Sequence, residues 1–261
     1  PYSWQTIGSM ADLDAATLDD VKTWFRTWYG PNNAVLVLAG DIDVATAKEK
    51  VTRYFGDIPA SATLADMKTH IPKHAQDTRE TIPDRVPQVR LYRGWPVAEM
   101  GTRDAALLDL FAQVLGGSAA SRFDTRLVHG DKIADQASAY QWSSEISGTF
   151  FLMSTVKEGV DPAKVEAALD EELKRLITQG PTAEELERAR VSGVAGFVRG
   201  IERIGGFGGK SDVLASCAVY QGKPDCYQEE LDILANATPA DVQAVAKKWL
   251  TGASHTILVQ P

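Results

Sequence analysis

Histidines are the side chains of this sequence that most readily bind a transition metal. His70 and His74 are separated by three residues, and on a helix this spacing places both imidazoles on one face, as in the H-x-x-E-H zinc motif. Lys73 stands where that motif needs a glutamate, and Pro72 disfavours the helix that would align the two rings. The pair is therefore predicted to be two solvated histidines of a connecting segment.

The other metal-binding side chains are scattered along the sequence. His129 is predicted to lie at the surface near a helix end, and His255 at the start of a strand. Cys217 and Cys226 do not form a C-x-x-C pair, which excludes the usual structural zinc site. The sequence favours two small buried thiols over a disulfide, although export of the protein would permit the bond. We predict no metal ligand and no catalytic residue in this chain.

Composition excludes several function classes. The 261 residues carry a net charge of −8, and no block of lysine and arginine supplies the basic face that nucleic-acid binding needs. No apolar run approaches the roughly 20 residues that span a bilayer. The sequence begins at Pro1 rather than methionine, from which we expect a processed product or a piece of a longer protein.

An internal repeat organises the elements that would position any site. The segment from Ala16 to Trp28 matches the segment from Ala237 to Trp249 without a gap. Because the two copies are separated by the length of a full domain, the chain is predicted to hold the end of one domain and nearly all of a second. The residues that recur are Ala16, Thr17, Asp20, Val21 and Trp28, matched by Ala237, Thr238, Asp241, Val242 and Trp249.

Both copies predict a helix followed by a strand. Thr17 and Thr238 are N-cap candidates, each with an aspartate three residues later that resembles a capping box. In the first copy an apolar helical face precedes the strand-like run from Ala34 to Ala39. The second copy ends in a strand from Thr256 to Val259. The residues of the first apolar face are Val21, Trp24, Phe25 and Trp28.

Helices and strands are mixed along the rest of the chain without strict alternation. This pattern predicts an α+β fold, and the repeat predicts that the first domain is truncated. The predicted domains are 1–59, the end of a first domain, and 86–261, a second and non-catalytic domain. Residues 60–85 lack periodicity and are predicted to be a linker. Further helices are predicted at 44–55, capped by Asp43, at 103–115, from Pro162 to Gly180, and from Thr182 to about Arg203, where Thr182 and Glu185 form a capping box. A short strand is predicted at 89–92, and two paired strands at 134–140 and 149–154.

Several short motifs resemble, in order and spacing, zinc metallopeptidases of the pitrilysin/insulinase (inverzincin) family. They include Trp28-Tyr29-Gly30-Pro31-Asn32-Asn33, Leu38-Ala39-Gly40-Asp41 and Tyr54-Phe55-Gly56-Asp57-Ile58-Pro59, and the resemblance begins at Pro1-Tyr2. Later matches are Leu115-Gly116-Gly117 and Lys132-Ile133-Ala134.

The resemblance implies repeated two-layer α/β sandwich domains, each a mostly antiparallel sheet covered by helices. It implies a peptide-hydrolysing enzyme in which pairs of such domains close around a peptide substrate. It implies zinc in the parent protein, held by an H-x-x-E-H motif upstream of Pro1 in a catalytic domain or partner half. The leading hypothesis is thus a fragment of a zinc metalloendopeptidase that serves substrate binding or scaffolding. The alternative is a non-catalytic half or subunit that helps to form the chamber. Bacterial origin and export to the periplasm are expected, with a cytoplasmic location as the alternative.

The resemblance also supplies the candidate site residues. Gly116, Gly117 and Ser118 resemble a substrate-contacting glycine loop, although a simple helix stop is the plainer interpretation. Arg122 is a candidate for a peptide carboxylate or backbone, or else an ion-paired residue. Active relatives carry an arginine and a tyrosine that grip the substrate, and Val128 and Asp135 stand at those places here, which favours the non-catalytic alternative.

Overall fold

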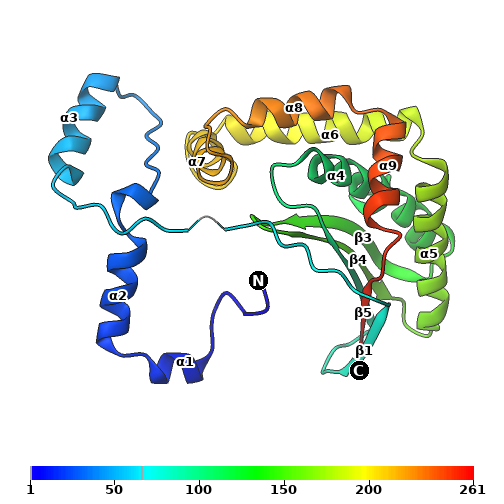
Figure 1. Cartoon of the computed structure of the whole chain (residues 1–261). Helices are drawn as coiled ribbons and strands as arrows, with labels where there is room; N and C mark the ends of the chain where they lie inside the picture. The colour runs from blue at the N-terminus through cyan, green and yellow to red at the C-terminus, as the bar shows by residue number, and fades with distance from the viewer. Residues whose placement is uncertain (1, 66) are drawn as a thin grey trace. The chain divides into compact units, whose positions relative to one another are not determined.

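The computed structural model describes residues 2–65 and 67–261 of the chain. Pro1, the first residue of the resembling motifs, and Asp66, inside the predicted linker, lie outside the described residues. The chain divides into two compact units (Figure 1). The first joins Pro1–Lys68 to Phe197–Tyr227, and the second joins Thr69–Gly196 to Gln228–Pro261.

The second unit is built on one mixed sheet of order β1-β5-β2-β4-β3. β1 and β5 are parallel, whereas the β5–β2, β2–β4 and β4–β3 pairs are antiparallel. The predicted pairing of residues 134–140 with 149–154 is confirmed. The strands are β1 (Thr78–Pro83), β2 (Arg90–Val97), β3 (Ala134–Ser143), β4 (Gly148–Val156) and β5 (His255–Gln260).

Helices α4 (Arg103–Gly116), α5 (Pro162–Gln179) and α9 (Pro239–Trp249) cover one face of this sheet (Figure 1). The core lies between them, because alternate residues of β4 are buried against the helices and the residues between them are half-buried on the other face. The π-helix η2 (Asp124–Gly130) leads into β3, and α6 (Ala183–Ile201) and α8 (Tyr227–Asn236) follow α5. The predicted α+β sandwich with a mostly antiparallel sheet is confirmed.

The first unit contains short helices whose ends follow the sequence signals. Asp43 accepts a hydrogen bond from the Thr46 amide and caps the helix that ends at Phe55, as predicted. The helices of the first unit include α1 (Met10–Ala15), α2 (Leu18–Trp28), the 3₁₀ turn η1 (Pro31–Asn33), α3 (Val44–Phe55) and α7 (Lys210–Gln221).

The two repeated helices begin in the same way. The Thr17 amide donates to Asp20 at 2.9 Å, and the Asp20 amide donates to the Thr17 hydroxyl at 3.2 Å. The same two distances recur between Thr238 and Asp241. Aspartate thus closes a full capping box in both copies, which confirms the prediction.

The strand predicted from Ala34 to Ala39 is wrong. These residues are in an irregular conformation, whereas the matching segment of the second copy forms β5. β5 has β1 on one side and β2 on the other, and no described strand lies beside the first copy. A strand exists only where a neighbour accepts and donates its backbone hydrogen bonds, so the same local sequence pattern has two outcomes.

The end of the predicted linker contains a strand. β1 (Thr78–Pro83) lies within residues 60–85 and pairs along its whole length with β5. Thr, Arg, Glu and Pro give β1 no apolar alternation, and all six of its residues are exposed, which explains why periodicity did not reveal it. β1 is an edge strand, where a polar sequence protects against pairing with other chains.

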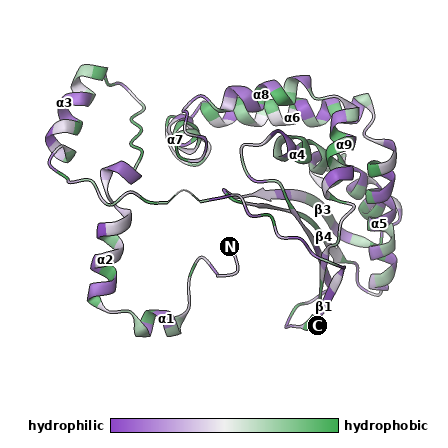
Figure 2. Cartoon of the chain, in the orientation of Figure 1, coloured by the Kyte–Doolittle hydropathy of each residue, from purple (hydrophilic) through white to green (hydrophobic). Residues whose placement is uncertain are grey.

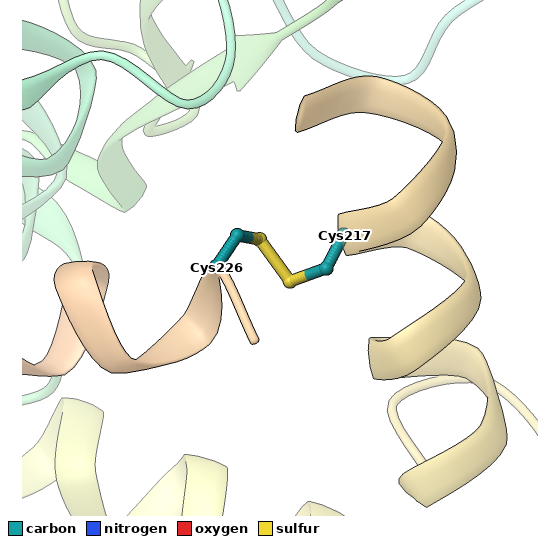
Figure 3. The surroundings of a disulfide bond; sticks show 2 residues. All are labelled: Cys217 and Cys226. Carbon is teal, nitrogen blue, oxygen red and sulfur yellow. A yellow bond between two sulfur atoms is a disulfide. The ribbon is translucent and has the colours of Figure 1, made fainter. Parts of the chain in front are cut away.

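The two cysteines form a disulfide, so the preference for free thiols was wrong. The bond joins Cys217 in α7 to Cys226, which directly precedes α8 (Figure 3). The intervening chain turns at Gly222, whose φ of 70° is in the left-handed region that glycine tolerates. This turn brings the two Cα atoms to 5.3 Å, a proximity that sequence spacing does not reveal.

Replacing both cysteines by serine is expected to lower the free energy of unfolding by about 2.5 kcal/mol, because the bond closes a short loop and restricts the unfolded chain. Both residues are only 4% exposed, so each serine also buries a hydroxyl. Urea denaturation followed by circular dichroism measures the loss. Wild-type protein in reductant is the control. A decrease in the free energy of unfolding of less than about 0.5 kcal/mol would contradict a stabilising role of the bond.

Candidate functional site

The predicted glycine loop follows α4 directly. A Cβ atom on Gly116 would lie 2.3 Å from the Ala139 amide nitrogen of β3, so this glycine permits a close approach of helix and strand. Gly117 is the C-cap of α4, and its amide donates to the Gln113 carbonyl at 3.3 Å. Ser118 is exposed and accepts a hydrogen bond from the Ala120 amide. The two glycines thus have packing and helix-ending roles, and a contact with substrate stays a prediction.

Arg122 forms an ion pair with Glu185. Its Nε and one Nη atom donate to the two carboxylate oxygens of Glu185 at 2.7 and 2.8 Å. Both side chains are largely buried, with 11% of Arg122 and 18% of Glu185 exposed. Arg122 therefore ties the turn that precedes η2 to the first turn of α6, and the structure shows this residue in an ion pair.

Glu185 has a second role at the same place. Its carboxylate accepts the Thr182 amide at 2.8 Å, and the Glu185 amide donates to the Thr182 hydroxyl, which completes the predicted capping box. Burial alone would raise the pKa of Glu185, but the hydrogen bonds from Arg122 and from the Thr182 amide lower it to about 2. The carboxylate is thus charged across the physiological range.

The loop and α6 border a small cavity of about 80 Å³. Ser118 and Glu185 line it, so the structure brings together one predicted residue and the partner of another. Gly116 and Gly117 do not line it. Its other lining residues are Gln113, Val114, Ala120, Arg188, Ala189 and Ser192.

The four histidines occupy separate places. His129 lies in the last turn of η2, 3.1 Å from Asp124, and His255 begins β5 with its Nδ1 atom 2.8 Å from the Thr78 hydroxyl. His70 and His74 lie in irregular chain, where the His70 amide donates to the Ile146 carbonyl. Across residues 2–65 and 67–261, no group of three or more His, Cys, Asp or Glu side chains is placed to hold a metal ion.

The face of the sheet opposite α4, α5 and α9 carries an aromatic cluster that the sequence pattern did not predict. The rings of Tyr140 on β3 and Phe151 on β4 stack with centroids 5.2 Å apart, and the Tyr140 hydroxyl donates to the Met153 sulfur at 3.0 Å. Burial, and then the neighbouring Tyr92, raises the pKa of Tyr140. The available signal was the run Phe150-Phe151-Leu152-Met153, which supplies apolar residues to both faces of β4.

A depression of about 180 Å³ opens on the same face, at the end of the cluster. It crosses three adjacent strands, β2, β4 and β3, and combines one cation, apolar side chains and neutral polar groups. Its lining residues are Arg90, Tyr92, Gln136, Met153, Ser154 and Thr155.

Val128 and Asp135 have structural partners in the second unit. Val128 is half-buried and packs against the hydrophobic core. Asp135 accepts a hydrogen bond from the Gln88 side-chain amide. Neither side chain offers the cation or the phenol that the resemblance to active relatives would require at these positions. No helix within the described residues has the length and apolar character that crossing a membrane requires.

Two curated bacterial proteins are similar to this chain. It is 24% identical to the zinc protease PqqE of Helicobacter pylori over 271 aligned positions. That alignment covers all of this chain and 59% of the relative. It is also 24% identical over 261 positions to the uncharacterized zinc protease SCO5738 of Streptomyces coelicolor, covering 94% of this chain and 53% of that protein. The chain therefore spans less than two thirds of the length of these relatives.

Solved structures share the fold. A protease from Helicobacter pylori superposes with a TM-score of 0.83 at 22% identity, over all of this chain and 63% of that one. A peptidase M16 inactive domain from Pseudomonas fluorescens also gives 0.83, at 17% identity, over all of this chain and 61% of that one. The sequence model of the family described as "Peptidase M16 inactive domain" matches residues 15–191. The resemblance to zinc peptidases is confirmed at this level, and the chain belongs to the peptidase M16 family through its inactive domain.

Proposed function

We propose that this chain is the non-catalytic part of a zinc metalloendopeptidase, where it docks against a catalytic domain and helps to enclose a peptide. The observation that carries the proposal is the exposed apolar face of α2. Val21, Trp24 and Phe25 are 46%, 57% and 53% exposed. Apolar residues are visible along this helix in Figure 2. A contiguous exposed apolar face of this kind is typical of an interaction surface.

The internal repeat identifies what such a face packs against. The equivalent residues of α9, Val242, Val245 and Ala246, are 0%, 4% and 0% exposed, because α4, α5 and β2 cover them. The same helix signature thus belongs on a sheet with a helical layer. The irregular segment from Ala34 to Ala39 would need neighbouring strands to form a strand itself, since its equivalent β5 lies between two strands. Both features support a first domain of the same fold as the partner.

Zinc does not fit the residues present. The histidines are dispersed, and the described part of the chain holds no cluster of ligands. The curated relatives are called zinc proteases, and this chain covers only part of each. These facts support a zinc site in the catalytic domain of the parent protein, with an H-x-x-E-H motif there. No catalytic step is assigned to residues of this chain.

The alternative is a chain that forms the chamber beside a catalytic partner encoded separately. The packing of Val128 and the pairing of Asp135 with Gln88 favour it, since neither residue is arranged to grip a reacting peptide. The disulfide supports export in either case, because such bonds form and persist in oxidising compartments such as the periplasm. A cytoplasmic location would leave the two thiols reduced.

One substitution in two contexts tests the docking surface. In the complete parent protein, Phe25→Asp is expected to lower the free energy of unfolding by about 3 kcal/mol or more, because it buries an unpaired charge. In the 261-residue chain the same change should stay within about 0.5 kcal/mol, since Phe25 is half exposed. Thermal and urea denaturation of both forms measure the difference.

The matched control is Thr23→Asp, whose equivalent Ala244 is exposed on α9. It should leave both forms unchanged. Equal effects of Phe25→Asp and Thr23→Asp in the complete protein would contradict the docking role. Zinc content and peptide hydrolysis are measured in parallel: both are expected of the complete protein. Stoichiometric zinc bound at submicromolar concentration by the 261-residue chain alone would overturn the assignment of a non-catalytic part.

A further inference from the structure

We propose that the depression on the sheet face opposite α4, α5 and α9 binds a peptide carboxylate through Arg90 and an adjacent apolar side chain of the same peptide through Tyr92 and Met153. The inference rests on the proposed function and names a subsite for it. Its starting point is the coincidence, in one hollow of about 180 Å³, of an unpaired cation and an apolar floor.

The strand register orders the hollow into two rows. Arg90 pairs with Thr155, and Thr155 pairs with Gln136, which makes a polar row across β2, β4 and β3. Tyr92 pairs with Met153 in the next row on the same face. Rows on one face of a sheet lie about 6.7 Å apart, because every second residue points the same way. That separation suits a terminal carboxylate and a neighbouring side chain of one extended peptide.

The polar row is free to bind a ligand. No hydrogen bond or ion pair joins the Arg90 guanidinium to another described residue, and the side-chain amide of Gln136 and the hydroxyl of Thr155 are equally unengaged within the described chain. An arginine fork, an amide and a hydroxyl side by side provide the donors that a carboxylate accepts. Ser154, by contrast, donates its hydroxyl to the Gln136 carbonyl.

The apolar row continues beyond the hollow. Gly94 of β2 pairs with Phe151 of β4, and a Cβ atom on Gly94 would lie 3.6 Å from the Phe151 ring. The absence of a side chain leaves that ring, stacked with Tyr140, accessible from the open face. A second apolar side chain of the peptide can therefore extend from Met153 toward this cluster, where aromatic surface supplies most of the contact energy.

Charge complementarity selects an anionic ligand. No carboxylate lines the hollow among the described residues. Asp135, the sequence neighbour of Gln136, accepts a hydrogen bond from Gln88 and is not part of the lining. On a chain with a net charge of −8, a local unpaired arginine is the feature that attracts a carboxylate, and the attraction weakens as salt increases.

Binding of fluorescein-labelled peptides to the purified chain tests the inference by fluorescence anisotropy. The probes are Gly-Ser-Gly-Leu-Phe with a free terminal carboxylate, the same peptide amidated, and amidated Gly-Ser-Gly-Asp-Phe, which carries its acid in a side chain. The free acid is expected to bind about tenfold or more tightly than the amide, because the charged hydrogen bonds to Arg90 are lost in the latter. Comparing the free acid with amidated Gly-Ser-Gly-Asp-Phe distinguishes binding of a terminal carboxylate from binding of a side-chain carboxylate.

Arg90→Gln should remove the preference for the acid, and Arg85→Gln is the matched control. Arg85 is also exposed and also lacks an ion pair among the described residues, so both variants remove one unpaired charge. The inference is overturned if the two variants behave alike, if the amide binds as well as both acids, or if no probe binds. Equal binding of acid and amide would still leave a peptide-binding chain. Failure of the proposed function is recognised separately, by the absence of hydrolysis in the complete protein.

Discussion

Gly116→Ala is expected to lower the free energy of unfolding by about 2 kcal/mol. The added methyl group would lie 2.3 Å from the Ala139 amide nitrogen and 2.7 Å from the Ser138 carbonyl carbon, which are backbone atoms of β3. Separating α4 from β3 costs about 3 kcal/mol as overpacking, and the better helix propensity of alanine offsets at most about 1 kcal/mol of that. Urea denaturation followed by circular dichroism measures the result.

Gly252→Ala is the matched control for this substitution. No heavy atom lies within 4 Å of the Cβ position of Gly252, and its backbone is outside the left-handed region. The control should change stability by less than about 0.5 kcal/mol. A Gly116→Ala protein as stable as the control would mean that α4 and β3 do not need this close approach. A contact between Gly116 and a ligand would then be the better explanation for a glycine at this position.

Arg122→Met is expected to lower the free energy of unfolding by about 2 kcal/mol at pH 7. The methionine keeps much of the packing of the arginine stem but removes the guanidinium that pairs with Glu185 at 2.7 Å. The depression of the Glu185 pKa from 4.5 to about 2 corresponds to roughly 3 kcal/mol, shared between Arg122 and the Thr182 amide. Arg122 is also one of the four predicted substrate contacts, so its structural role must be measured before any effect on activity is interpreted.

The pH dependence of this loss has a definite sign. Because the pKa of Glu185 is lower in the folded state than its usual 4.5, its contribution to stability is complete above pH 4.5 and is lost as the pH falls toward 2. The difference between wild type and Arg122→Met should therefore be largest at pH 7 and shrink at pH 3. Comparing the variant with wild type at each pH removes the effects of other carboxylates.

Arg188→Met provides the control, because Arg188 pairs with Glu184 on the same helix at 2.7 Å. Those side chains are 48% and 85% exposed, and such surface pairs contribute about 0.5 kcal/mol or less. An Arg122→Met protein no less stable than Arg188→Met, or a difference that stays constant down to pH 3, would rule out the buried pair as a significant stabilising contact.

The amino-acid sequence by itself determined where several helices of this protein begin and end. The capping boxes at Thr17, Thr182 and Thr238 and the stop of α4 at its glycine pair were predicted from adjacent residues, and the structure has each of them. Such signals involve hydrogen bonds between residues three or four positions apart, so they need no knowledge of the rest of the fold. The order of short motifs likewise indicated the family.

Tertiary structure decided everything that depends on a distant partner. The segment from Ala34 to Ala39 has a strand-like pattern but no neighbour, whereas the polar β1 is a strand because β5 lies beside it. The disulfide depends on the turn at Gly222. The partner of Arg122, Glu185, lies in α6 and is brought near it by the packing of that helix.

The candidate binding surface follows the same division. Arg90, Gln136 and Met153 are far apart in the chain and have no common motif, and the register of β2, β4 and β3 alone brings them to one hollow. Equally, α2 and α9 share their capping box and apolar pattern, yet one apolar face is exposed and the other is buried. Burial is a property of what surrounds a helix, and no local pattern contains that information.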